Sequence, residues 1–145
     1  MIVSAHVATG AAAGALVRSR LAAVVLGAGL HALGDAIPHR DIPSRRFEVC
    51  SGIVGLAALA WRRGPLDPAA LGAAACAAPD LEHVLPFPRP GGRKLFPTHR
   101  VEGWHRSGGI PAWAQLAGAG AILAVVLRAR TPGAPASPRR GATSA

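Results

Sequence analysis

Five apolar runs rich in Ala, Leu, Val and Gly follow one another along the chain, and each ends at polar residues or at proline. The runs cover residues 2–17, 21–37, 49–61, 68 to about 85, and 110–127. The fourth run follows Asp67 and Pro68, a pair typical of the N-cap and first position of a helix. The pattern predicts an all-α protein of about five short helices without a β-sheet.

The composition adds a membrane interpretation to this helical pattern. Half of the residues are hydrophobic, 16% are charged and the mean hydropathy is +0.31, whereas soluble domains carry about 25% charged residues. Arginines stand where apolar runs end, as they do at the ends of transmembrane helices. We therefore expect residues 1–130 to form one membrane-embedded domain, a polytopic bundle integral to the inner membrane. We expect residues 131–145, rich in Pro, Gly and Arg, to be a disordered tail.

The alternative is an Ala-rich helical bundle in water, whose helices would have few charges with which to face solvent. The net charge of +9 raises the question of nucleic acid. The chain has no Tyr and no basic stripe interleaved with aromatic residues, so we expect no nucleic-acid partner. Membrane lipids are the expected partners. The two cysteines do not have the spacing of a metal site.

Histidines and acids gather at one end of the expected bundle. If successive helices run in opposite directions, all six histidines and all the acidic residues except Asp67 fall at the same end. In H-A-L-G-D-A-I-P-H, His31 and Asp35 are four residues apart and share a helix face. A mixed set of imidazoles and carboxylates suits zinc, and also manganese or iron. The candidate ligands are His6, His31, Asp35, His39, Asp80, His83, His99 and His105.

Two other roles fit the same polar groups. Acids within apolar helices need partners, and His31 with Asp35, or Asp80 with His83, could satisfy one another in a non-catalytic scaffold or metal-binding protein. Intramembrane acids also line the ion paths of transporters, although here the polar groups occupy only one end of the helices.

Three segments of the chain resemble the LexA-regulated inner-membrane hydrolase family, a group of small membrane-bound, metal-dependent hydrolases. They are the early His6, the P-D-L-E-H turn at residues 79–83, and T-H-R-V-E-G-W-H-R-S at residues 98–107. The family's pattern is an early His, then L-P-D-x-D-H, then H-R-G-x-T-H-S. The resemblance implies that the metal ligands include His6, Asp80, His83, His99 and His105.

The chain departs from that family pattern in several places. Glu82 replaces the second Asp, the two late histidines are six residues apart instead of five, and Trp104 replaces the Thr before the last His. The segment H-A-L-G-D-A-I-P-H has no counterpart in the pattern.

These features together predict a membrane-embedded, metal-dependent hydrolase. A bound metal lowers the pKa of water to about 7, and Glu82 or Glu102 is the expected general base. Arg100 and Arg106 stand beside the late histidines and could bind an anionic group. We therefore expect the substrate to be a phosphoester of a membrane lipid or a lipid-linked compound.

Overall fold

The computed structural model describes residues 1–129, so the expected tail at 131–145 lies outside the described residues. Residues 1–129 form five α-helices and three short 3-10 helices, with no β-strand among them, which confirms the all-α prediction. The α-helices are α1 (Val3–Val17), α2 (Arg20–Ala36), α3 (Arg45–Arg63), α4 (Pro68–Ala77) and α5 (Ala112–Arg128). The 3-10 helices are η1 (Ala78–His83), η2 (Pro90–Gly92) and η3 (Pro97–Arg100).

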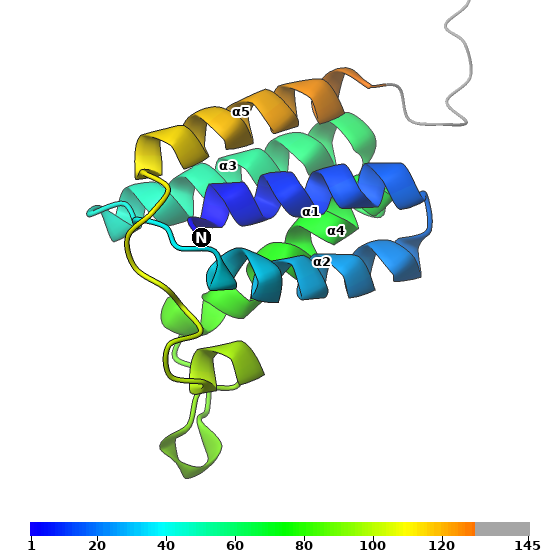
Figure 1. Ribbon diagram of the computed structural model, residues 1–145. Coiled ribbons are helices and arrows are strands. Elements are labelled where there is room, and N and C mark those ends of the chain that lie inside the picture. The colour runs from blue at the N-terminus through cyan, green and yellow to red at the C-terminus, as the bar shows by residue number, and fades with distance from the viewer. Residues whose placement is uncertain (130–145) are drawn as a thin grey trace, which may run out of the picture.

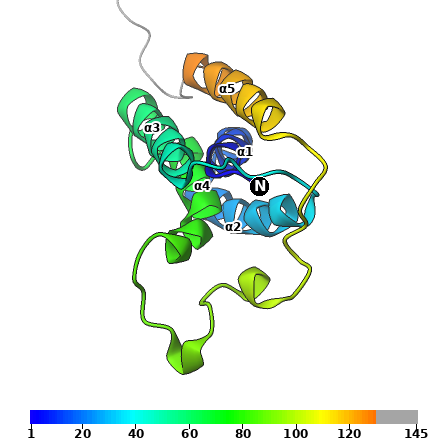
Figure 2. The same cartoon turned by 90° about the vertical axis from the view of Figure 1, so that its left-hand side faces the viewer.

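Helix α1 lies at the centre of the bundle and contacts each of the other four α-helices (Figure 1). The view along the helices shows α2, α3, α4 and α5 arranged around it (Figure 2). The long connection between η1 and α5 leaves the bundle at the end where α1 begins and α2 ends. This connection carries η2 and η3 and returns beside residues 38–40, to which it is hydrogen-bonded.

Helix starts follow from short polar side chains. The hydroxyls of Ser19 and Ser44 accept hydrogen bonds from N–H groups in the first turns of α2 and α3. Asp67 does the same for α4, accepting from Ala69 N at 2.8 Å with Pro68 in the first turn, which confirms the expected cap. The expected end of α4 near residue 85 is wrong, because the α-helix stops at Ala77 and continues as η1. Pro79 has no N–H to donate to the carbonyl four residues earlier.

Glycines let three helices approach closely. A Cβ atom on Gly72 of α4 would lie 2.4 Å from the carbonyl oxygen of Gly10 in α1. A Cβ atom on Gly27 of α2 would lie equally close, at 2.4 Å, to the carbonyl oxygen of Gly72. Backbone therefore packs on backbone where α1, α2 and α4 meet, and this brings the histidines of α1 and α2 against the end of α4.

The expectation of a polytopic transmembrane bundle is wrong, and with it the assignment to the inner membrane. Among residues 1–129, no helix is both long enough and apolar enough to cross a bilayer. Helices α2 and α5 have 17 residues each, or about 26 Å at 1.5 Å per residue, against a hydrocarbon core of about 30 Å. The longer α3 begins and ends with charged residues such as Arg45 and Arg63. The apolar runs that suggested spans include highly exposed side chains, among them Leu16 and Trp61.

Candidate metal centre

Three ring and carboxylate atoms converge at one end of the bundle. The Nε2 atom of His31 lies 3.2 Å from Nε2 of His99 and 3.2 Å from Oδ2 of Asp35, and Nε2 of His99 lies 3.6 Å from the same oxygen. Two nitrogens bound to one tetrahedral zinc ion at about 2.0–2.1 Å are about 3.3 Å apart. The three atoms are therefore spaced as ligands of one metal ion. We call them the primary triad.

Hydrogen bonds fix the tautomers of the two histidines. His31 Nδ1 lies 2.9 Å from the carbonyl oxygen of Cys76, so it must donate, and His99 Nδ1 donates to the Glu82 carboxylate. In a neutral ring each Nε2 is then a bare lone pair. Without a proton or a metal ion among them, the atoms of the primary triad would direct lone pairs at one another.

When no metal is bound, a proton on His99 Nε2 removes the repulsion between the lone pairs of the primary triad. Burial lowers the pKa of His99, but hydrogen bonds to Asp35 and Glu82 outweigh burial and raise it above 6.5. For Asp35, burial alone would raise the pKa. Hydrogen bonds, first those of His31 and His6, outweigh burial and hold the pKa of Asp35 far below its usual range. Asp35 therefore stays ionised, and its charge is balanced by the Met1 ammonium, 2.7 Å from Oδ1, and by protonated His99 near Oδ2.

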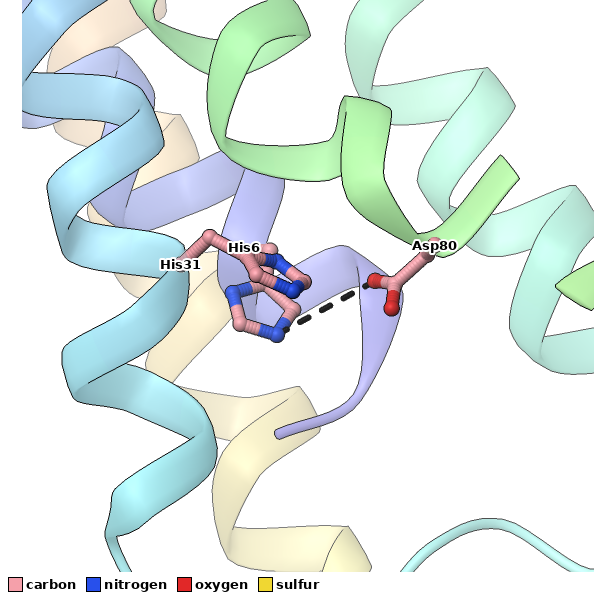
Figure 3. Close-up of side chains that lie close together, drawn as sticks. All are labelled: His6, His31 and Asp80. Carbon is pink, nitrogen blue, oxygen red and sulfur yellow. Dashed lines mark ion pairs between the residues drawn. The ribbon is translucent and has the colours of Figure 1, made fainter. Parts of the chain in front are cut away.

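Asp80 faces the histidines from η1 with an unpartnered oxygen. Its Oδ2 is buried without a hydrogen-bond partner and lies 3.9 Å from Nε2 of His6. Figure 3 shows the carboxylate directed at the stacked rings of His6 and His31, whose centroids are 4.3 Å apart. Burial raises the pKa of Asp80 to about 6. A buried carboxylate oxygen without a donor is a group that a metal ion or a bound water would satisfy.

His6 supports the triad from α1. Its side chain is fully buried, and its Nε2 lies 3.0 Å from Oδ1 of Asp35, the oxygen that also accepts from the Met1 amino group at 2.7 Å. Burial lowers the pKa of His6 to about 4, so the ring is neutral and donates this hydrogen bond through Nε2–H. His6 thus orients the Asp35 carboxylate.

Glu82 is held on both of its oxygens. One accepts from His99 Nδ1, and the other accepts from the backbone N–H groups of Leu95 and Phe96. Burial would raise the pKa of Glu82, but these hydrogen bonds lower it. A carboxylate that accepts from the second nitrogen of a metal-binding imidazole is the usual orienting group in metal sites. This arrangement favours an orienting role for Glu82 over the general-base role expected from the sequence.

A second group of potential ligands adjoins the first. His39 Nε2 lies 3.0 Å from Nε2 of His105, and one oxygen of Asp35 lies within 4.8 Å of ring nitrogens of both. A further set brings Asp80 and His83 together with His99. Several groups of histidine and aspartate side chains could therefore hold a metal ion, and every candidate ligand expected from the sequence belongs to one of them.

A pocket of about 480 Å³ opens onto these groups. Its wall includes Asp35, Asp80, His83, His99 and His105. Its cationic side chains are Arg45 and Lys94, and Val3, Val49, Val84 and Val101 give it apolar surface. Its space lies where a small anionic substrate could reach Asp35 and His99 of the primary triad.

Two expected anion-binding arginines and one expected base lie elsewhere. Arg100 donates to the carbonyl oxygens of Lys94 and Leu95 and thereby shapes the connecting loop. Arg106 and Glu102 are exposed, and neither of them nor Arg100 is part of the pocket wall. Their roles stay predictions, without support from their positions.

Sequence reasoning missed three groups that shape the site. Asp41 lies 3.2 Å from His39 Nε2, Glu48 lines the pocket, and the carbonyl of Cys76 fixes the ring of His31. Asp41 stands two residues after His39, so its proximity could have been foreseen. A backbone carbonyl at the end of α4 leaves no signal in the residue types.

Comparison with known proteins returns no match: no protein-family model, no curated protein and no solved structure is similar to this chain. The resemblance to the LexA-regulated inner-membrane hydrolases therefore stays a prediction.

Proposed function

We propose that this protein is a metal-dependent phosphoester hydrolase whose metal ion, zinc by preference, is held by His31, Asp35 and His99. The observation that carries the proposal is the primary triad, in which three lone-pair atoms face one another 3.2–3.6 Å apart. Two histidines and one carboxylate, with a further position for water or substrate, form one of the known ligand sets of catalytic zinc.

The surroundings of the triad fit a bound divalent metal. Each histidine donates its Nδ1–H to a fixed acceptor, so its Nε2 is free to bind. The negative charges of Asp35, Glu82 and Asp80 offset the charge of a dication. When bound, such a metal lowers the pKa of water to about 7 and polarises a phosphoryl oxygen.

Asp80 is the proposed general base. Its pKa of about 6 leaves it ionised at neutral pH yet still able to accept a proton. Its unpartnered Oδ2 faces His6 and His31, and Asp80 is part of the pocket wall. In the reaction the oxygen of a water molecule attacks phosphorus, and Asp80 takes the water proton. The bond from phosphorus to the leaving oxygen breaks with its electron pair on that oxygen, which takes up the proton from Asp80 and leaves as an alcohol.

The pocket wall supports a phosphoester with an apolar substituent. Arg45 and Lys94 can pair with phosphate oxygens, while the valines of the wall give the alcohol portion an apolar surface. A lipid phosphate combines these two features, and it is the substrate class that we propose.

Hydrolysis by zinc-loaded protein tests this function. A short-chain lipid phosphate and a chromogenic phosphoester are supplied to wild type, to His31→Gln and to Asp80→Asn, and released product is measured. We expect turnover by the wild type and a loss of about 10²–10⁴-fold in Asp80→Asn. Arg93→Gln, an exposed change in the same connecting loop that does not touch the pocket, serves as the control. Zinc-loaded wild type without turnover would favour a metal-holding or scaffold role.

A further inference from the structure

We propose that a second divalent cation binds at Asp35, His39 and His105, so that Asp35 is shared by two metal ions. The proposal rests on the proposed function, because its first ion is the one held by the primary triad. Asp35 belongs to both groups: one of its oxygens lies within 4.8 Å of His31 and His99 ring nitrogens, and one within 4.8 Å of those of His39 and His105. A carboxylate between two imidazole pairs is the arrangement by which dinuclear centres share a ligand.

The ring of His39 is prepared to bind a cation. Its side chain is almost fully buried, and its Nδ1–H donates to the carbonyl oxygen of Ile37 at 2.7 Å. With Nδ1–H donating, a lone pair on Nε2 would point toward Nε2 of His105, 3.0 Å away, and Oδ1 of Asp41, 3.2 Å away. These two separations match those of ligands on one ion, and the Asp35 oxygen, within 4.8 Å of both rings, would complete the set by turning toward that ion. Asp41 offers a further oxygen to the same position.

Backbone hydrogen bonds hold His105 against His39. The N–H of His39 donates to the Arg106 carbonyl at 3.1 Å, and the N–H of Ile110 donates to the Pro38 carbonyl at 3.0 Å. Gly109 is in the left-handed region, and a Cβ atom there would lie 2.2 Å from the Pro38 oxygen. The returning loop is thus fixed at the second group, although His105 itself is exposed.

The charges around the second group leave room for a dication. Asp35, Asp41 and Glu48 bring three carboxylates to this side of the site. Glu48 lies close enough to Asp41 and His39 for their charges to shift its pKa. The positive groups facing it are the Met1 ammonium, 2.7 Å from Asp35, and Arg45 of the pocket wall. When the primary ion neutralises Asp35, the negative charges of Asp41 and Glu48 remain, and a second dication would offset them.

Two metal ions would define how a phosphoester is bound. The pocket wall includes His105 and Asp41 of the second position, His99 of the primary triad, and the proposed base Asp80. A phosphate in this pocket reaches both groups, and paired metals stabilise both the attacking and the leaving oxygen of an in-line displacement. His39 and His105 would then hold an ion that activates the bound phosphoester.

Zinc stoichiometry tests the second site. Wild type, His105→Gln, His39→Gln and the control Arg93→Gln are dialysed against buffered zinc, and bound zinc per chain is measured by mass spectrometry. We expect two equivalents in wild type and in Arg93→Gln, and one in each histidine variant. His105→Gln is the decisive variant, because this exposed residue can be replaced without disturbing the core, and circular dichroism verifies its fold.

The outcomes separate this proposal from the proposed function. One equivalent in wild type, unchanged in His105→Gln, overturns the second site and leaves the primary site standing. No zinc in wild type overturns both. Loss of all zinc in His105→Gln shows a single site that includes His105, and also overturns the proposal. With Mn²⁺, spin coupling in the wild-type electron paramagnetic resonance spectrum that disappears in His105→Gln supports two adjacent ions, and uncoupled spectra contradict them.

Discussion

The Nε2 atoms of His31 and His99 lie 3.2 Å apart, although the two residues are 68 positions apart in the chain. Each ring is fixed from behind, His31 by the Cys76 carbonyl and His99 by Glu82. Two neutral imidazoles held in this way repel each other unless a cation or a proton lies between them. The position of the metal ligands therefore depends on the packing of α2 against α4 and on the path of the connecting loop.

Glu82→Gln tests the orienting role of Glu82. The amide keeps the size of the side chain but weakens the hydrogen bond from His99 Nδ1 and those from the loop backbone. We expect zinc affinity to fall about 10–100-fold, and the pKa of His99 to fall because a charge partner is lost. Competition titration with a zinc chelator and NMR titration of His99 measure the two effects. Lost hydrolysis at unchanged zinc affinity would instead identify Glu82 as the base.

Asp80→Asn tests whether Asp80 acts as a base or merely occupies space. In the metal-free fold the pKa of Asp80 is raised from 3.8 to about 6, so its ionisation reduces stability progressively between these two values. We expect metal-free Asp80→Asn to melt above wild type at pH 7 and close to wild type below pH 4. Zinc affinity should fall by about tenfold, the low end of the losses for residues around a metal site and far less than the loss of turnover. A much larger loss of zinc would place Asp80 among the ligands.

Zinc binding should depend on pH through His99. Because its pKa is raised above 6.5, zinc must displace a proton from His99 at pH 6.5 and below. Affinity should therefore rise about tenfold per pH unit until the pH passes the pKa of His99, and then level off. His6 and His83, whose pKa values burial lowers to about 4, are already neutral in this range. Calorimetry in buffers of different ionisation enthalpy counts the protons released, and zero release at pH 6 would contradict this prediction.

Gly72→Ala tests the close packing that positions the histidines. The new methyl group would lie 2.4 Å from the Gly10 carbonyl oxygen, so α1 and α4 must separate. We expect a loss of about 1–3 kcal/mol in the free energy of unfolding, together with weaker zinc binding, measured by chemical denaturation and competition titration. Gly29→Ala is the matched control: it faces open space in α2 and should stabilise the helix by up to about 1 kcal/mol. Equal effects of the two substitutions would contradict the packing account.

Much of the fold and of the ligand set could be predicted because it depends on local sequence. The helix at Pro68 starts at the cap that Asp67 provides, and the spacing of His31 and Asp35 places both on one face of α2. The alternation of helix direction was sufficient to bring His6, Asp80 and His99 to the same end.

The membrane prediction failed because composition does not report helix length or surface position. Pro79 shortens α4 to 10 residues, and charged residues end α3. A high apolar content therefore does not give these helices an apolar length that could cross a bilayer. The roles of single carboxylates were also hidden. Glu82 and Asp80 are two residues apart in the chain, yet one has both oxygens hydrogen-bonded and the other has an unpartnered oxygen. Only the three-dimensional course of the loop at residues 95–99 separates them.

The most direct test of the metal centre is anomalous X-ray diffraction from zinc-soaked crystals, with data collected on both sides of the zinc absorption edge. We predict an anomalous peak bounded by Nε2 of His31, Oδ2 of Asp35 and Nε2 of His99, which disappears in His31→Gln crystals. Crystals at saturating zinc that show the three atoms in place without a peak among them would contradict the account.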